Sequence, residues 1–175
     1  GLLLSVGLSE DASVALLDAI LDWRDADPLK RLHGAEEEDY RAAGKSFVPS
    51  NAPFETVDEL QRVLGMTPEL YRMLAPALTV YSRQPGINTV VASREVLKAI
   101  PGINPALVEQ YLVQRQALIA TDQKAPALAG LPAYFVRSVA KMADGTVFVR
   151  QAVARLAQDA KRPFAVLAWT EGDAE

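Results

Sequence analysis

The residues most able to do chemistry are carboxylates that follow the first predicted helix. Two runs carry them, Asp22-Trp-Arg-Asp-Ala-Asp27 and Gly34-Ala-Glu-Glu-Glu-Asp-Tyr40. Calcium prefers several hard oxygen ligands, and carboxylates lead among them. Asp25, Asp27 and Glu36 fall at the first, third and twelfth positions of an EF-hand-like count. The spacing therefore indicates a candidate calcium site.

The same count also shows that this is not an EF-hand loop. Leu29 stands at the fifth position, where a ligand is needed, and Lys30 at the sixth, where the sharp turn needs glycine. Two interpretations stay open on spacing alone. The acidic run is either a calcium site of another shape or a solvated loop of charge.

Other catalytic chemistry has little support in the sequence. There is no cysteine, which excludes thiolate metal sites, disulfides and cysteine nucleophiles. The single histidine, His33, stands in a predicted loop, and no nucleophile-elbow glycines surround Ser46 or Ser50. We therefore predict that the chain is not an enzyme. A hydrolase that uses His33 is kept as an alternative without a substrate.

Composition places the chain among ordinary globular proteins. Of the 175 residues, 50% are apolar and 23% are charged. A formal net charge of −4 argues against a duplex-binding protein, which usually carries a basic face. No apolar run is long enough to span a bilayer. Because the sequence begins with Gly1, we expect a piece of a longer protein from which any membrane segment is missing.

The first 120 residues predict a helical domain, interrupted by the acidic loop over 22–51. Apolar residues at helical spacing predict a first helix that ends at Trp23. Capping residues mark the expected helix starts. These residues are Ser9, Thr56 (with Glu59 in a capping box), Thr67, Ser93 and Asn104.

Two segments of this region, 60–70 and 97–107, resemble each other, and 3–11 is a weaker third copy. Each predicts a helix, a tight glycine turn with positive φ, and a second helix, as in helix-hairpin-helix (SAM-like) units. The turn glycines are Gly7, Gly65 and Gly102. Such units bind DNA phosphates through hairpin amides and nearby basic residues. Neither full copy has a basic residue at its tip, and Glu69 and Glu109 lie just beyond. A nucleic-acid-binding module is kept as the alternative function.

The last part of the chain, 121–175, predicts a three-stranded antiparallel sheet. Strand-like alternation occurs over 134–142, 146–155 and 164–169, and Asp144-Gly145 supplies the first hairpin turn. The fold class is therefore α+β. A three-stranded sheet needs a helix or a neighbour to cover its apolar face. Trp23 and Trp169 are expected to be partly buried core residues.

Several short motifs occur in one order along the chain. They are 22–27, Gly34-Ala-Glu36, Tyr40, Pro49-Ser-Asn-Ala-Pro53, Val57-Asp-Glu-Leu60 and Gly65-Met-Thr-Pro-Glu-Leu-Tyr-Arg-Met-Leu-Ala-Pro76. This order resembles minor pseudopilin K of type II secretion systems. The pattern of that family runs Asp-Trp-x-Asp-x-Asp, Gly-Ala-Glu, Tyr, Pro-Asn-x-Pro and a Glu-Leu helix. The family's later Asn-x-Asn-Thr-Ala is matched only in part, by 87–92.

The resemblance implies a structural role and a set of partners. It implies that 1–120 is a helical domain inserted into a pilin-like fold and that 121–175 is the pilin-like β region. The protein would sit at the tip of the type II secretion pseudopilus and support protein export across the outer membrane. Its partners would be minor pseudopilins I and J, with exported proteins as further candidates and no nucleic acid. It would lie in the periplasm, anchored in the inner membrane by an N-terminal helix that this sequence lacks.

The resemblance also implies calcium bound in the acidic region. The residues carried over as ligands are Asp25, Asp27 and Glu36, followed by Asp22 and Asn51.

Overall fold

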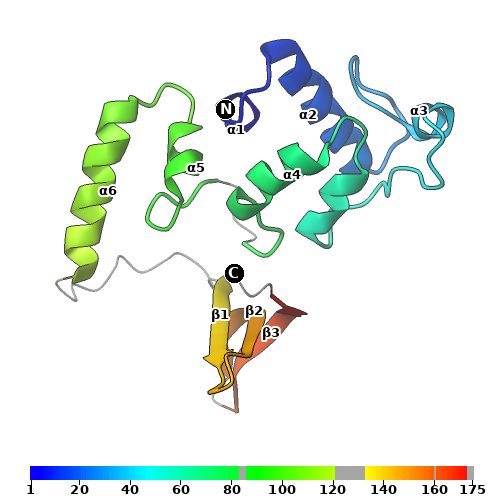
Figure 1. Ribbon diagram of the computed structural model, residues 1–175. Coiled ribbons are helices and arrows are strands. Elements are labelled where there is room, and N and C mark those ends of the chain that lie inside the picture. Colours follow the sequence, from blue (N-terminus) through cyan, green and yellow to red (C-terminus); the bar gives the residue numbers. More distant parts are fainter. Residues whose placement is uncertain (83–85, 121–132, 160, 173–175) are drawn as a thin grey trace. The chain divides into compact units, whose positions relative to one another are not determined.

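The chain forms two compact units, one helical and one built from a sheet (Figure 1). The computed structural model describes residues 1–82, 86–120, 133–159 and 161–172. As far as these residues are described, the first unit comprises 1–80 and 84–123, and the second comprises 81–83 and 124–175. The predicted α+β class is confirmed. The interpretation of 1–120 as an inserted domain and of 121–175 as a separate region stays a prediction.

The helical unit consists of short elements that begin where the sequence supplies a cap. Its α-helices are α1 (Leu2–Ser5), α2 (Glu10–Arg24), α3 (Glu37–Ala42), α4 (Pro68–Leu74), α5 (Arg94–Lys98) and α6 (Pro105–Ala120), and its 3₁₀ helices are η1 (Val57–Arg62) and η2 (Ala75–Ala77). The hydroxyl oxygens of Ser9, Thr67 and Ser93 accept hydrogen bonds from backbone N–H groups three residues on, at 3.3, 3.2 and 3.3 Å. These predicted helix starts are therefore confirmed. Within the described part of the chain, no helix combines the length and the apolar character needed to cross a membrane.

Glycine turns join the paired helices as the repeat predicted. Gly7, Gly65 and Gly102 have φ of 95°, 88° and 76°, a region that a side chain disfavours. Figure 1 shows α5 beside α6, and two ion pairs join them. Arg94 and Lys98 on α5 approach the same Glu109 carboxylate on α6 at 2.5 and 3.0 Å. The basic residues nearest to the second hairpin are thus already paired with an acid.

The core of the helical unit gathers around the end of α2. Trp23 is only 2% exposed and contacts three aromatic rings. Its ring centroid lies 5.7 Å from that of Tyr40 in a tilted arrangement, 6.2 Å from that of Phe47, and 6.4 Å from that of Phe54 in a stacked arrangement. The buried residues of this cluster are Leu16, Ala19, Trp23, Ala35, Tyr40, Leu60, Val63, Leu70 and Leu74. Because Ala35 and Tyr40 lie within the acidic loop and are buried in this core, the loop is held along its length as well as at its start.

Two local predictions need correction. The acidic loop, predicted as irregular from Arg24 to Asn51, contains α3, which begins where the Glu36 N–H donates to Asp39 Oδ2 at 2.9 Å. The segment after Thr56 is a 3₁₀ helix, although its predicted capping box with Glu59 is present.

The second unit is a three-stranded antiparallel sheet in the order β1-β2-β3. The strands are β1 (Ala133–Lys141), β2 (Val147–Asp159) and β3 (Arg162–Glu171). At the first hairpin Gly145 has φ of 87°, and Asp144 Oδ1 accepts from Thr146 N at 2.9 Å, as the Asp-Gly signal predicted. The β2–β3 register shifts between Val153 and Ala154.

One face of this sheet is apolar and exposed. Residues opposite each other in an antiparallel pair share a face, so the register assigns the side chains to faces. The large apolar residues of one face are Tyr134, Val136, Phe148, Leu156, Phe164, Val166 and Trp169, and all are exposed. The predicted burial of Trp169 is wrong, since 65% of it is exposed. We call these seven residues the apolar sheet face.

Candidate metal centre

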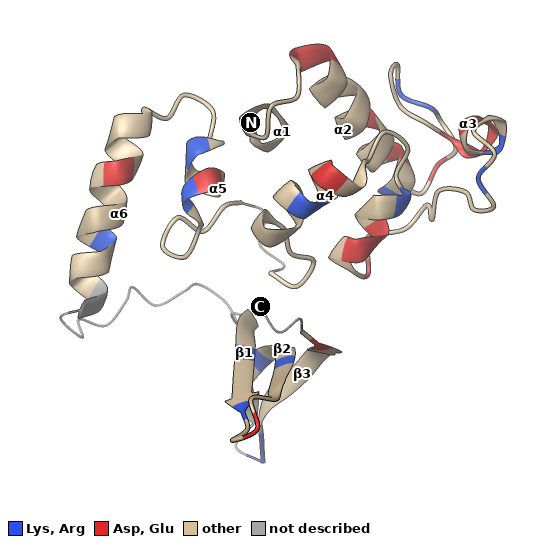
Figure 2. Ribbon diagram, viewed as in Figure 1, with Lys and Arg blue, Asp and Glu red and all other residues tan. Residues whose placement is uncertain are grey.

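The predicted ligands lie on the segment that leaves α2 and returns to the core. Figure 2 shows acidic residues in red on α2 and α3 and basic residues in blue on the loop between them. Asp22 belongs to the last turn of α2, and Asp25 follows its end, where the Asp25 N–H still donates to Leu21 O at 2.9 Å. Glu36 is the residue at which α3 begins. Helix ends therefore fix three of the five predicted residues.

Asp22 is the most enclosed of them, with none of its surface exposed. Its carboxylate accepts from the Arg31 backbone N–H at 3.4 Å (Oδ1) and 3.2 Å (Oδ2). A Cβ at Gly34 would lie 1.9 Å from Asp22 Oδ2, so only glycine leaves room for this carboxylate. Burial raises the pKa of Asp22, and the negative charge of Asp25 raises it further. Hydrogen bonds from the backbone N–H groups of Arg31 and Ala35, together with the positive charge of Arg31, lower this pKa, but the net shift is upward.

Asp25 and Asp22 both form ion pairs with Arg31. The Arg31 Nε lies 3.3 Å from Asp22 Oδ1, and Arg31 Nη2 lies 3.0 Å from Asp25 Oδ2. One guanidinium therefore bridges two carboxylates. The second oxygen of Asp25, Oδ1, is buried without a hydrogen-bond partner.

Glu36, like Asp25, has a buried carboxylate oxygen without a hydrogen-bond partner. Only 8% of the residue is exposed, and its Oε1 is buried without a hydrogen-bond partner. Burial raises the pKa of Glu36, and the charges of Asp22, Asp25 and Asp27 raise it further. The charges of the neighbouring carboxylates thus disfavour the ionised form of Glu36, and its buried Oε1 has no hydrogen bond to compensate.

Asp27 and Asn51 are positioned differently. Asp27 is exposed, and its Oδ1 accepts from the Leu29 N–H at 3.0 Å, which closes a turn within the loop. Asn51 is exposed, with φ of 46°, and its N–H donates to Trp23 O at 3.0 Å. Asn51 and Glu36 line one cleft together with neighbouring residues of the loop. Asn51 can therefore face the same space as Glu36, although it is far from Asp22 along the chain.

The fit to a divalent cation depends on the donors that the site offers. Among the described residues, no set of three or more His, Asp or Glu is close enough to hold a metal ion as it stands. Two buried carboxylate oxygens nevertheless lack any partner, and hard oxygens are the ligands that calcium prefers. Unpaired buried charge is costly, and a bound cation is one way to compensate it. The donor types therefore suit calcium, although the described side chains do not form a set of three at metal-binding distance.

Sequence reasoning missed Arg31 and the reason for Gly34. Arg31 is a single basic residue in a loop, and no spacing rule connects it to the acids nine and six residues before it. His33, the residue of the alternative hydrolase, is exposed, and its backbone N–H donates to Asp18 Oδ2 at 3.2 Å. That contact holds the loop to α2.

Comparison with known proteins agrees with the resemblance found in the sequence. A family model described as type II secretion system protein K matches residues 1–83. The chain is 35% identical to the type II secretion system protein K of Klebsiella pneumoniae over 121 residues, which are 67% of this chain and 36% of that protein. It is 31% identical to the protein of the same name from Pseudomonas aeruginosa over 115 residues, which are 65% and 34% of the two chains. The chain therefore spans about a third of the length of the curated relatives it matches.

A solved structure extends the likeness of fold to almost the whole chain. It is the crystal structure of the GspK-GspI-GspJ complex from the type 2 secretion system of enterotoxigenic Escherichia coli. A chain of that complex superposes with a TM-score of 0.71 at 18% identity, over 99% of this chain and 68% of the other. The predicted resemblance is confirmed: residues 1–83 match the model of the type II secretion system protein K family, and 121 residues of the chain align with a protein of that name at 35% identity.

Proposed function

We propose that this chain is part of a structural minor pseudopilin that sits at the tip of a type II secretion pseudopilus. Its role is assembly, not catalysis, and it supports the export of proteins across the outer membrane. The proposal is supported by the named relatives and by the likeness to a chain of the GspK-GspI-GspJ complex.

One observation of the structure carries this proposal, namely the apolar sheet face. Seven large apolar side chains stay exposed on one side of a three-stranded sheet. Exposed apolar surface of this kind marks a contact site in a soluble protein. A subunit of an assembly presents a surface of this kind to its neighbour.

The proposed partners are minor pseudopilins I and J, and the proposed location is the periplasm. The full protein would be held at the inner membrane by an N-terminal helix, as the family resemblance implies. Helical assemblies grow by head-to-tail contacts. A helical unit on the same chain would fill the face to which the next subunit adds, which accounts for a position at the tip.

We also propose calcium as a structural ligand of the acidic loop. Asp22, Asp25 and Glu36 would hold it, with Asp27 and Asn51 completing the set. Calcium would supply the positive charge that the unpaired oxygens of Asp25 and Glu36 lack. The protein's own contribution is to keep the carboxylates of Asp22 and Glu36 buried, at the end of α2 and the start of α3.

Thermal unfolding tests the calcium proposal. A ligand that binds only the folded state at ~100 times its Kd stabilises it by ~2.7 kcal/mol. The midpoint should rise from a chelator to excess calcium in the parent and not in a variant with Asp25→Asn and Asp27→Asn. Equal midpoints with and without calcium in the parent would remove calcium from the account.

Secretion tests the proposed function. A strain without the gene for this protein should retain its exported proteins in the periplasm, and the full-length gene should restore export. Phe164→Asp on the apolar sheet face should fail to restore it, while Lys161→Gln on the β2–β3 turn should restore it. Normal export in the strain without the gene would contradict the proposal.

The alternative, a nucleic-acid-binding module, has no observation in its favour. Phosphate binding needs unpaired positive charge. Arg94 and Lys98, beside the second hairpin, both pair with Glu109.

A further inference from the structure

Arg31 occupies the place between two carboxylates of the proposed calcium site. Its Nε lies 3.3 Å from Asp22 Oδ1 and its Nη2 3.0 Å from Asp25 Oδ2. Its backbone N–H separately donates to Asp22. The side chain is 43% exposed, so solvent lies on its other side. The two contacts of Arg31 with Asp22, backbone and side chain, are thus independent of each other.

The single positive charge of Arg31 does not neutralise the negative charges of the surrounding carboxylates. One guanidinium faces the charges of Asp22 and Asp25, and Glu36 and Asp27 add further negative charge nearby. The neighbouring Lys30 is engaged elsewhere, with Asp39 at 2.5 Å. Glu36, only 8% exposed, keeps an unpartnered Oε1, and Asp25 keeps an unpartnered Oδ1. The Arg31 guanidinium therefore leaves two buried carboxylate oxygens of this cluster without a hydrogen bond.

We propose that the Arg31 side chain is an internal competitor of the metal ion. It bridges Asp22 and Asp25 when no cation is bound, leaves into solvent when a divalent cation bridges them, and thereby sets the affinity of the site. This inference rests on the proposed calcium site. Arg31 is a positioning residue, since it acts through the two carboxylates.

The structure makes this exchange inexpensive. Exposed ion pairs contribute roughly 0.2–1 kcal/mol, which corresponds to up to about a five-fold change in affinity. Because the Asp22 side chain is fully buried, the upper end of that range is expected for the loss of the Arg31 guanidinium. The hydrogen bonds from the Arg31 backbone to Asp22 do not depend on the side chain. The loop can therefore keep its path while the guanidinium swings away, and Asp22 stays oriented.

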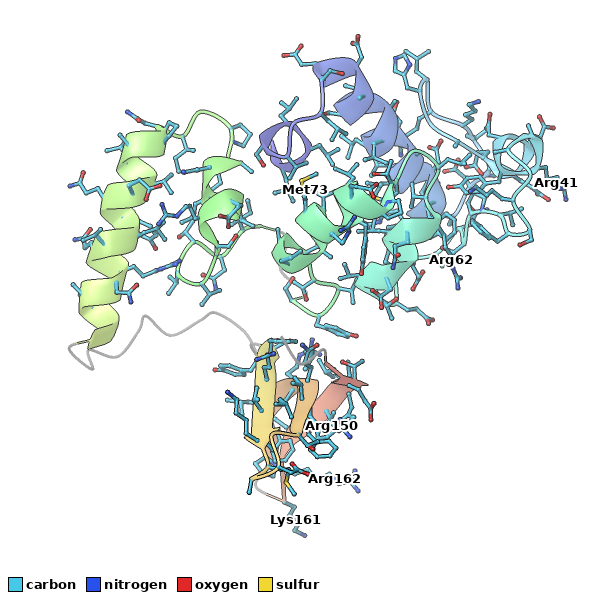
Figure 3. All side chains as sticks on the ribbon, viewed as in Figure 1. Arg41, Arg62, Met73, Arg150, Lys161 and Arg162 are labelled. Atoms are coloured by element: carbon cyan, nitrogen blue, oxygen red, sulfur yellow. The ribbon has the colours of Figure 1, made fainter. Side chains whose placement is uncertain are left out.

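The test compares Arg31→Gln with Arg41→Gln. Arg41 lies on α3, is 69% exposed and pairs with Glu37, so its loss removes a positive charge of the same region without touching Asp22 or Asp25 (Figure 3). Isothermal titration with calcium should give a Kd about three- to five-fold lower for Arg31→Gln than for the parent. Arg41→Gln should give the parent value, and Arg31→Lys, which keeps the charge, should lie near the parent.

Thermal unfolding midpoints measured with and without calcium distinguish a competitor role of Arg31 from a purely structural one, which the Kd alone does not do. In a chelator Arg31→Gln should unfold at a lower temperature than the parent, because Asp22 and Asp25 then repel each other without a bridge. In saturating calcium the two proteins should unfold together. A merely structural arginine would lower both midpoints equally.

The outcomes separate this inference from the calcium proposal. If the parent binds calcium and Arg31→Gln binds it equally or more weakly, the competitor role is wrong and the calcium site stands. If the parent does not bind calcium, the site and the competitor role fail together. If Arg31→Gln does not fold, Arg31→Lys decides, because a Kd far from that of the parent contradicts a role that depends on charge.

Discussion

Replacing Gly34 with alanine should destabilise the helical unit through a single contact. The new Cβ would lie 1.9 Å from Asp22 Oδ2, and contacts below 3.0 Å are essentially never found. Gly34 does not have a positive φ, so steric overlap and not backbone strain is the cause. Either the Asp22 carboxylate or the loop must move by about 1 Å, the difference between those two distances.

That movement has a cost that the structure allows us to bound. Asp22 is fully buried and accepts from the Arg31 N–H at 3.2 Å. A hydrogen bond to a charged group contributes about 1.5–3 kcal/mol. Alanine in place of glycine gains roughly 0.4–1 kcal/mol from the unfolded chain. The net loss for Gly34→Ala is therefore roughly 0.5–2.6 kcal/mol.

Urea unfolding measures this value, with Gly86→Ala as the matched control. A Cβ at Gly86 would meet nothing within 4 Å, and its φ is not positive, so this variant should be as stable as the parent or slightly more stable. Both variants are best made with Trp169→Phe, so that the buried Trp23 reports on the helical unit alone. Equal stability of Gly34→Ala and Gly86→Ala would refute the contact between Gly34 and Asp22.

Three further predictions concern the rest of the molecule. Leu74→Ala should lower the free energy of unfolding by about 2–5 kcal/mol, because Leu74 is 2% exposed. Met73, labelled in Figure 3, is half-exposed, so Met73→Ala should lower it by much less. Arg115→Ala should accelerate hydrogen exchange in the segment 89–92, whose carbonyls at Thr89, Val90 and Ala92 accept from its guanidinium at 3.2, 3.3 and 2.8 Å, while Gln114→Ala on the same helix should not. Burial raises the pKa of Tyr40 from 10.0 to about 12, so between these pH values the folded state keeps a phenol proton that the unfolded state loses. The contribution of Tyr40 to the free energy of unfolding should be fully present below pH 10 and fall by roughly 2–3 kcal/mol as the pH rises toward 12. In denaturant titrations at a series of pH values, Tyr40→Phe should lack this alkaline fall in the free energy of unfolding.

The parts of the fold that the sequence predicted are those set by neighbours along the chain. A cap such as Thr67 acts on an N–H three residues away, so its helix start is readable from a short window. The turn at Gly102 needs only the residue itself to permit positive φ. The hairpin at Asp144-Gly145 belongs to the same class.

The parts that could not be predicted depend on groups brought together by the tertiary fold. Helix α3 begins at Glu36, a weak capping residue, so the acidic run concealed it. The exposure of Trp169 depends on what covers the sheet, which a strand pattern does not state. The bridge made by Arg31 requires the loop to fold back on α2, and no rule of spacing links these residues.

The candidate site was predicted in its residue types and less well in its arrangement. Arg31 joins Asp22 and Asp25 at the end of α2, and Glu36 lies where α3 begins. Asp27 binds its own loop, and Asn51 reaches the cleft beside Glu36 through the fold of the returning chain. Calcium binding by this set stays a prediction.

The proposed assembly with minor pseudopilins I and J is tested most directly by mixing the three proteins. Sedimentation velocity of this chain with pseudopilins I and J from the same bacterium should show one species with the mass of a ternary complex. Phe164→Asp on the apolar sheet face should weaken that complex. Three separate boundaries at all concentrations, with no shift on mixing, would contradict the account.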